Sequence, residues 1–300
     1  MPGRAPAPRA PVPASDADGA TLYVVATPIG NLGDVTLRAL ETLRSVPLIA
    51  AEDTRITRRL LARYEIPTRA ISYHARSGPS RQEELLDHLR GGADLALVTD
   101  AGTPVVSDPG GELVAAWAGE GGRVVPIPGA SSVLAAVSAS GIAGPRWSFE
   151  GFLPRSGRDR RERLVRLAAD DRATVIFEAP TRLVGTLRDL VAACGPDRAA
   201  AVCRELTKLH EQIARGTLAE LAAAVGDGSI PARGELVIVV RGRDASANSA
   251  ASGDAQPVAA SMEGGRARVQ ALVDEGIPRS EAARRVASET GLSRRELYRS

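Results

Sequence analysis

The sequence predicts an α/β protein of two domains, in which a parallel N-terminal sheet precedes a second, mixed sheet and a small helical tail. The chain has 300 residues, a length typical of about two domains. Over its first half, five short apolar segments alternate with helical patterns, the order that produces a parallel sheet covered on both faces. In the second half, apolar segments follow one another more directly, which favours a mixed sheet.

The composition is that of a globular protein. Hydrophobic residues make up 44% of the chain but aromatic residues only 3%, so its cores must be built from Ala, Val and Leu. The formal net charge is only +2, so basic residues indicate a binding surface for an anionic partner only where they cluster. Cys194 and Cys203 lack metal-like spacing and are expected to be free thiols in a reducing cytosol.

We expect a cytoplasmic protein. No apolar run approaches the roughly 20 residues of a membrane helix. Residues 1–20 are rich in Pro and Ala and lack the apolar core of a signal peptide, so they are expected to form a disordered extension.

The N-terminal domain is expected over residues 21–144. Its predicted strands are Leu22–Ala26, Leu48–Ala51, Ile71–His74, Leu95–Val98 and Arg123–Ile127. Its predicted helices are Val35–Ser45, Thr57–Tyr64, Ser80–Arg90, one that begins near Glu112, and Val133–Ser140. Ser80, with Glu83 three residues later, predicts a capping box for the third helix.

Residues 145–154 are expected to form a linker to a second domain over residues 155–243. The predicted strands there are Thr174–Glu178, Ala199–Arg204, Glu211–Arg215 and Glu235–Arg241. The predicted helices are Arg158–Leu167, one that starts over 179–182, and Leu218–Val225. Residues 244–262 are rich in Ala, Ser and Gly and predict a flexible linker. Residues 263–300 predict a tail like a helix-turn-helix, with helices from Glu281 and about Ser293 and a turn at Gly291.

The stretch from Leu95 to Gly111, LALVTDAGTPVVSDPGG, predicts a ligand-binding loop. A buried strand ends there in a carboxylate, Asp100, and a turn at Gly102. Open α/β sheets bind ligands outside the carboxyl ends of their strands. A tight turn with an Asp cap explains this segment equally well when it is considered alone.

Several common sites are excluded. The loop after the first strand, Thr27–Asn31, lacks the Gly-x-Gly-x-x-Gly pattern of a dinucleotide site. No serine elbow and no His/Cys/Asp cluster with metal spacing is present. Small and polar residues do recur where strands end, and we expect three or four of these loops to face one cleft between the domains. The loops are 27–34, 52–55, 100–104, 128–132, 178–182 and 204–208.

Eight motifs occur in the order and spacing of one family. They are TPIGNLGD, AEDTR, DAGTPVVSDPG, PIPGASS, EGFLP, FEAPTR, RELTK and GELVIVV. The sequence resembles the ribosomal RNA small subunit methyltransferase I family, which has the two-domain tetrapyrrole methylase fold, from about Leu22 to Val240. The tail also looks like that of the family. DAGTP and PGASS are shared loosely across the superfamily, whereas AEDTR, EGFLP, FEAPTR and RELTK are more specific. The loop YHARSGPS departs from the pattern, because relatives often carry a longer His/Asn/Glu run there.

The resemblance implies a cofactor, S-adenosylmethionine, in a cleft between the two sheets. It also implies methylation of the ribose 2′-hydroxyl of cytidine 1402 in the decoding centre of 16S rRNA. The partners would be this RNA or the small ribosomal subunit and a second copy of the chain, with no metal and no membrane. The implied cofactor residues are Pro28, Asp100, Gly102, Thr103, Ser131, Ser132, Phe177, Glu178, Glu235 and Leu236.

Methyl transfer from an activated sulfonium depends mainly on alignment of the reacting atoms. A general base for the ribose hydroxyl would add about 10²–10⁴ in rate. The candidate catalytic residues are Asp53, Glu178, Glu205, Lys208 and His74. The sequence does not choose between them, because structural roles explain them as well. Asp53 could form an ion pair or cap a helix, and Glu178 could be a hydrogen-bond acceptor at the end of a strand. Lys208 could belong to a solvated edge, and His74 could be a surface histidine.

Arginines predict the RNA contacts. The segment from Arg155 to Arg166 contains six arginines against Asp159 and Glu162, an excess that suits a phosphate backbone, although a solvated helix face would look the same. The predicted RNA-binding residues are Arg55, Arg158, Arg160, Arg161, Arg163, Arg182, Arg204 and Lys208. Two alternatives stay open, a tetrapyrrole methyltransferase of the same fold and a non-catalytic RNA-binding protein.

Overall fold

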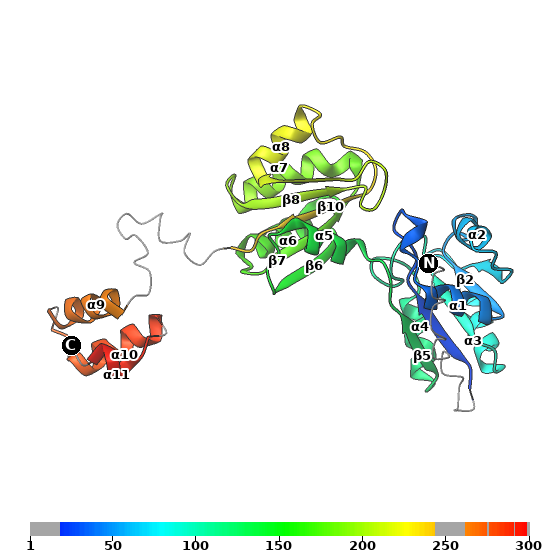
Figure 1. Ribbon diagram of the computed structural model, residues 1–300, viewed down its shortest axis with the longest axis horizontal. Coiled ribbons are helices and arrows are strands. Elements are labelled where there is room, and N and C mark those ends of the chain that lie inside the picture. Colours follow the sequence, from blue (N-terminus) through cyan, green and yellow to red (C-terminus); the bar gives the residue numbers. More distant parts are fainter. Residues whose placement is uncertain (1–18, 244–261, 275, 291, 299–300) are drawn as a thin grey trace, which may run out of the picture. The chain divides into compact units, whose positions relative to one another are not determined.

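A computed structural model describes residues 19–243, 262–274, 276–290 and 292–298 (Figure 1). The chain divides into two compact units, residues 1–243 and 244–300. The first unit holds two α/β domains, each built on a five-stranded sheet. The extension expected over 1–20 and the linker expected over 244–262 lie outside the described residues, apart from 19, 20 and 262.

The first sheet is parallel throughout, with the strand order β3-β2-β4-β1-β5, which confirms the prediction of a parallel N-terminal sheet. Its strands are β1 (Thr21–Val25), β2 (Leu48–Ala51), β3 (Arg69–Ser72), β4 (Leu95–Val98) and β5 (Arg123–Ile127). Because parallel strands share one direction, the loops that follow them all leave the sheet at the same edge.

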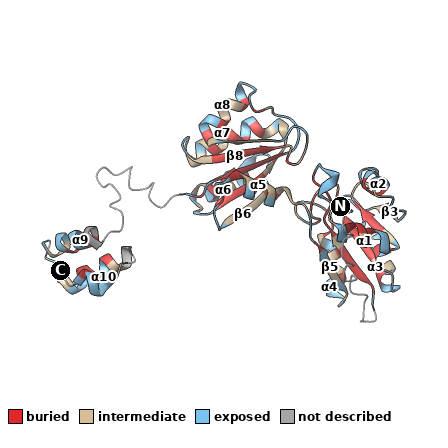
Figure 2. Ribbon diagram, viewed as in Figure 1, coloured by how far each residue is buried: buried red, intermediate tan, exposed pale blue. Residues whose placement is uncertain are grey.

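Helices cover both faces of this sheet. The helices of the two faces are α1 (Leu37–Ser45) and α2 (Thr54–Arg63) on one, and α3 (Pro79–Arg90) and α4 (Gly111–Gly119) on the other. A short 3-10 helix, η1 (Leu32–Asp34), precedes α1. Figure 2 shows buried strands between helices whose outer faces are exposed. The capping box predicted at Ser80 is wrong, because α3 starts one residue earlier, at Pro79, after Gly78 and without a side-chain cap. Proline suits this first position, since it has no N–H to satisfy.

The second sheet is mixed, as predicted, with the order β6-β7-β10-β8-β9. Its strands are β6 (Trp147–Phe152), β7 (Ala173–Glu178), β8 (Ala199–Arg204), β9 (Gln212–Thr217) and β10 (Leu236–Val240). Only β6 and β7 are parallel neighbours. Strand β6 lies where the linker over 145–154 was expected, which corrects that interpretation. An edge strand with a register shift between Phe149 and Gly151 interrupts the alternation by which strands are recognised.

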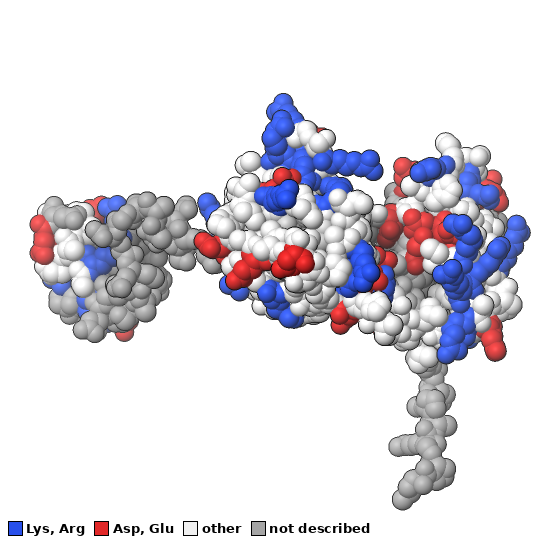
Figure 3. Space-filling model, turned by 90° about the horizontal axis from the view of Figure 1, so that it is seen from above, with Lys and Arg blue, Asp and Glu red and all other residues white. Residues whose placement is uncertain are grey.

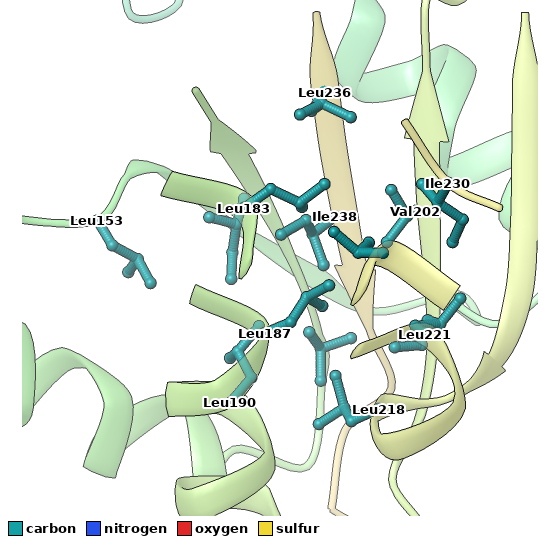
Figure 4. Close-up of a cluster of buried hydrophobic side chains, with 14 of the residues drawn as sticks. Leu153, Leu183, Leu187, Leu190, Val202, Leu218, Leu221, Ile230, Leu236 and Ile238 are labelled. Atoms are coloured by element: carbon teal, nitrogen blue, oxygen red, sulfur yellow. The ribbon is translucent and has the colours of Figure 1, made fainter. Parts of the chain in front are cut away.

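One face of the second sheet carries three helices, α6 (Gly157–Ala169), α7 (Leu183–Cys194) and α8 (Leu218–Gly226), and the 3-10 helix η2 (Pro180–Arg182) leads into α7. Figure 4 shows the core between them, where leucines of α7 and α8 meet Val202 and Ile238 of the strands. Burial of such side chains contributes about 1.5–3 kcal/mol each.

The other face is covered by α5 (Ser132–Ser140). We expected this helix in the N-terminal domain, but Val133 and Ala136 pack against Val175 and Val239 of the second sheet. At its end, Arg215 of β9 donates from Nε to the Ser140 carbonyl at 3.0 Å. The boundary between the sheets therefore lies before α5, and the start of this helix stands where the two domains meet.

Over its described residues, the second unit has three helices: α9 (Met262–Asp274), α10 (Arg279–Thr290) and α11 (Arg294–Tyr298). Helices α10 and α11 lie where the pair was predicted, and α9 precedes them. Its core consists of Val269, Ala282, Ala283, Val286 and Leu297. Within the parts of the chain that the structure describes, no helix is long and apolar enough to cross a membrane.

Candidate active site

Three loops at the carboxyl edge of the first sheet are joined by hydrogen bonds, two between backbone groups and one from a side chain. Thr27, after β1, donates its N–H to the Gly102 carbonyl at 2.8 Å, and Gly102, after β4, donates back at 3.1 Å. Thr103 Oγ1 donates to the carbonyl of Ala130, after β5, at 3.3 Å. Gly102 has φ of 86°, a conformation that favours glycine, so the backbone of this turn requires a glycine at position 102.

A cavity of about 310 Å³ lies in the first unit, between this loop layer and the second sheet. Eight of the predicted cofactor residues line it: Gly102, Thr103, Ser131, Ser132, Phe177, Glu178, Glu235 and Leu236. Ile29, Val106, Phe152, Pro180 and Val237 add apolar wall, and Ala101, Ser107, Asp108, Val133, Ala179 and Gly234 complete the lining. The cavity therefore brings together residues from both sheets and from the start of α5.

Pro28 and Asp100 are not among the residues that line the cavity, and their assignment as cofactor contacts stays a prediction. The Asp100 carboxylate instead accepts the backbone N–H of Asp53 at 2.9 Å, and the Asp100 N–H donates to Glu52 Oε2 at 3.3 Å. These bonds join the loops after β2 and β4, so Asp100 holds the loop layer in place behind the cavity.

Asp108 is the lining residue with the most unusual electrostatics. Burial, together with the nearby charges of Glu52 and Asp100, raises the pKa of Asp108 to about 7. The sequence gave no sign of this environment, because Glu52 and Asp100 approach Asp108 only through the fold.

Backbone strain concentrates beside the cavity. Among the described residues, five other than glycine have positive φ, and four of these lie in two loops: Val105 (74°), Ser107 (67°), Glu205 (49°) and Thr207 (67°). Such conformations, rarest for a β-branched residue, persist only where the surroundings impose them and are common at ligand sites.

Asp53 is held by its own helix. It is the N-cap of α2, accepting the N–H of Arg55 at 2.8 Å, and it also binds the Arg55 guanidinium through Nε at 3.0 Å. The side-chain hydrogen bond from Arg55 is the largest cause that lowers the pKa of Asp53 to about 2. The helix cap and the ion pair with Arg55 are the contacts that the Asp53 carboxylate makes in this structure.

Glu178 is buried in a network of charges. Its carboxylate accepts from the Ala179 N–H at 2.9 Å, from Arg182 Nε at 3.1 Å and from the Thr186 hydroxyl. Thr186 in turn accepts from Arg160 Nη2 at 2.9 Å. Because the side chain is fully buried with donors on both oxygens, it joins β7 to α7 and α6 and is not free to take a proton from a substrate.

Glu205, Lys208 and Glu235 come together from two loops of the second domain. Glu205 Oε1 accepts from the Glu235 N–H and from Lys208 Nζ, both at 2.9 Å, and Lys208 also pairs with Glu235 at 3.1 Å. The backbone hydrogen bond and the lysine lower the pKa of Glu205. Of this group only Glu235 lines the cavity.

His74 lies apart from the cavity. Its ring Nδ1 accepts the N–H of Arg76 at 3.1 Å in an exposed loop, beside a separate hollow lined by Ser77 and Arg81. The structure does not bring it together with the other candidate bases.

Several arginines that were predicted to bind RNA form hydrogen bonds within the fold. Arg160 is buried and donates to Asp189 at 2.7 Å and to the Pro154 carbonyl at 2.9 Å. Arg182 donates to the Leu153 carbonyl at 2.7 Å, and the buried Arg204 to that of His210, also at 2.7 Å.

These contacts hold Arg160, Arg182 and Arg204 within the fold, and their assignment to RNA stays a prediction. Arg158 and Arg163 are paired with Glu162 and Glu150. A count of charges along the sequence cannot reveal partners that the fold supplies.

No group of three or more His, Cys, Asp or Glu side chains in the described part of the chain could hold a metal ion. Cys194 and Cys203 are both free thiols. Burial raises the pKa of Cys203 to about 11.

Comparison with known proteins gives the family. Residues 21–222 match the tetrapyrrole (corrin/porphyrin) methylases. The ribosomal RNA small subunit methyltransferase I of Synechocystis is 48% identical over 277 residues, which cover 92% of this chain and 95% of that protein. The protein of the same name from Bacillus subtilis is 39% identical over 281 residues, 94% of each chain. The chain belongs to the ribosomal RNA small subunit methyltransferase I family.

Solved structures agree with the fold. A cobalt precorrin-4 methyltransferase superimposes with a TM-score of 0.58 at 20% identity, covering 74% of this chain and 94% of its own. Diphthine synthase superimposes with a TM-score of 0.54 at 14% identity, covering 74% and 89%. At these identities the likeness of this chain to the solved structures shows the architecture alone.

Proposed function

We propose that the protein is an S-adenosylmethionine-dependent methyltransferase that modifies the ribose 2′-hydroxyl of cytidine 1402 in the decoding centre of 16S rRNA. The observation that carries this proposal is the 48% identity, over 92% of the chain, to a protein named ribosomal RNA small subunit methyltransferase I. The cavity, built from the loops in which the family motifs lie, supports it.

The cavity fits the cofactor in size and in chemistry. Pockets for small ligands have about 300–1,000 Å³, mostly apolar walls and a few polar groups. The apolar walls, including Phe152, Phe177 and Val237, suit an adenosyl group. Ser131 and Ser132, at the N-terminus of α5, suit a carboxylate, because backbone N–H groups and the helix dipole favour negative charge there.

Asp108 supplies the complementary negative charge. A carboxylate in a largely apolar wall is stabilised by a neighbouring cation, and S-adenosylmethionine carries a sulfonium and an ammonium. We assign Asp108 to the cationic part of the cofactor. A uroporphyrin-III C-methyltransferase from Thermus thermophilus, 22% identical with a TM-score of 0.54, was solved with S-adenosyl homocysteine and supports cofactor use in this fold.

The bound cofactor supplies an activated methyl group. The chain then has to align the ribose oxygen with that methyl group and exclude water, which is the work of the strained loops and the apolar walls. Of the residues nominated as bases, Asp53, Glu178 and Glu205 are held in ion pairs or buried networks. Positioning, rather than any of these three carboxylates, is therefore the main contribution that we assign to the protein.

Titration calorimetry and methyl transfer test the proposal. We expect one molecule of S-adenosylmethionine to bind per chain, and labelled methyl to pass to small ribosomal subunits or to 16S rRNA. The absence of cofactor binding would favour a non-catalytic RNA-binding protein. Transfer to a tetrapyrrole but not to RNA would favour the second alternative, which the solved structures support by fold only.

We also propose that the enzyme works as a homodimer in the cytoplasm. Light scattering at micromolar concentration should then give twice the chain mass of 31.3 kDa. A value equal to the chain mass would contradict the dimer.

A further inference from the structure

Helix α2 presents a row of arginines on its exposed face. Arg55, Arg58, Arg59 and Arg63 stand at positions i, i+3, i+4 and i+8, the spacing of one side of a helix, and all four are exposed. The opposite side, with Thr57, Leu60 and Leu61, is buried against the first sheet.

Two of these arginines have no partner within the described residues. Arg55 is paired with Asp53, and the Arg63 guanidinium lies 5.7 Å from the centre of the Tyr64 ring. In the described parts of the chain, the side chains of Arg58 and Arg59 form no hydrogen bond and no ion pair. This row differs from α6, where Arg158, Arg160 and Arg163 all pair with acidic side chains.

The fold does not explain this arrangement. Like charges at i, i+3 and i, i+4 repel, and the row contains three such pairs: Arg55–Arg58, Arg55–Arg59 and Arg59–Arg63. Arg55 also stands in the first turn of the helix, where the dipole disfavours cations. A negatively charged partner would relieve both effects.

The start of α2 lies at the same sheet edge as the cavity. The backbone N–H of Asp53, the cap of this helix, donates to Asp100, and the loop that follows Asp100 lines the cavity with Ala101, Gly102 and Thr103. Figure 3 shows long basic side chains on the surface of the first domain. The row from Arg55 to Arg63 covers about 12 Å of helix axis, enough to meet several phosphates of one strand.

We propose that the exposed arginine face of α2, Arg55, Arg58, Arg59 and Arg63, binds the phosphate backbone of the RNA substrate. The inference rests on the proposed function and adds the surface by which the RNA reaches the cavity. Phosphate contacts give affinity and register but no base identity, so this face places the strand without selecting the nucleotide.

A salt titration of RNA binding tests the face. The variant is R58Q/R59Q, and its matched control is R123Q/R188Q, which removes the same charge from two other exposed arginines that have no assigned role in RNA binding. Each lost phosphate contact changes the slope of log K against log salt by about 0.7–0.9. R58Q/R59Q should therefore flatten the slope by about 1.4–1.8 and weaken RNA binding, while the control should retain the wild-type slope.

Two further measurements keep the result interpretable. Cofactor affinity and the thermal midpoint of R58Q/R59Q should equal those of the wild type or exceed them slightly, because like-charge pairs are removed. A lower midpoint would show that these arginines are structural and would overturn the inference. A wild-type slope in R58Q/R59Q, or an equal loss in the control, would also overturn it.

The proposed function fails separately from this inference. If the wild type transfers methyl groups to rRNA but R58Q/R59Q binds RNA with an unchanged slope, only the assignment of the face is wrong. If the wild type neither binds rRNA nor methylates it, both proposals are wrong.

Discussion

At the scale of single residues, Glu178 tests the distinction between a catalytic and a structural carboxylate. It is fully buried and accepts from Arg182 and Thr186. Removing one partner of a buried ion pair costs about 3–5 kcal/mol. We expect Glu178→Ala to lower the thermal midpoint by roughly 6–20 °C, at about 2–4 °C per kcal/mol for a domain of this size.

The control for Glu178 is Asp189→Asn, at the exposed end of the same network, where Asp189 binds Arg160. It should lower the midpoint by much less, because solvent screens the Asp189 carboxylate. A Glu178→Ala variant that keeps the wild-type midpoint but loses methyl transfer would show that Glu178 is catalytic and not structural.

Asp108 predicts a pH dependence of cofactor binding. Because its pKa is raised to about 7, this carboxyl is mostly neutral at pH 6 and mostly ionised at pH 8. Only the ionised form attracts a cation, so affinity for S-adenosylmethionine should rise by up to about tenfold between these pH values. S-adenosyl homocysteine, which lacks the sulfonium, should respond less.

Asp108→Asn should abolish the difference between pH 6 and pH 8 in calorimetric titrations. An unchanged pH dependence in this variant would show that another group faces the cation.

At the scale of elements, α5 connects the loop layer to the second sheet. Arg215 donates from Nε to the carbonyl of Ser140 and from Nη2 to that of Ala139, at the end where the helix dipole favours a cation. We expect Arg215→Gln to cost about 1 kcal/mol and to lower the thermal midpoint by about 2–4 °C. Arg188→Gln, an exposed arginine on α7, should stay within about 0.5 kcal/mol of the wild type, and equal losses in both would contradict this role.

Local signals decided which elements could be predicted. Strand β4 and the turn at Gly102 are visible in the sequence, because an apolar run is followed at once by residues that break it. Strand β6 was not predicted, because the feature that identifies it as a strand is its pairing with β7 at the edge of the sheet, which the local sequence does not show. The packing of α5 against the second sheet was not predicted for the same reason, since the local sequence of a helix does not indicate which sheet it packs against.

The site was predictable only in part, for a related reason. Loops at strand ends indicated Gly102, Ser131 and Glu235 correctly as cavity residues. The ion pair of Arg160 could not be predicted, because its partner Asp189 is 29 residues away along the chain and only the fold brings the two together.

At the scale of the whole molecule, each of the two units has a buried core of its own. We expect a chain that ends at Arg243 to bind S-adenosylmethionine as tightly as the full chain and to unfold at the same temperature. Its RNA affinity should fall, because a tethered second contact raises the effective concentration of the RNA at the cavity. A loss of cofactor binding on truncation would show that the tail belongs to the cofactor site.

The most direct test of the central claim is a map of ribose methylation on small ribosomal subunits lacking this modification, after incubation with the protein and S-adenosylmethionine. The proposal predicts one new 2′-O-methyl group, at cytidine 1402 of the decoding centre. It also predicts that Gly102→Val abolishes the signal, because Gly102 has φ of 86° and lines the cavity. Methylation of a base, methylation at another site, or no transfer by a protein that binds the cofactor would contradict the account.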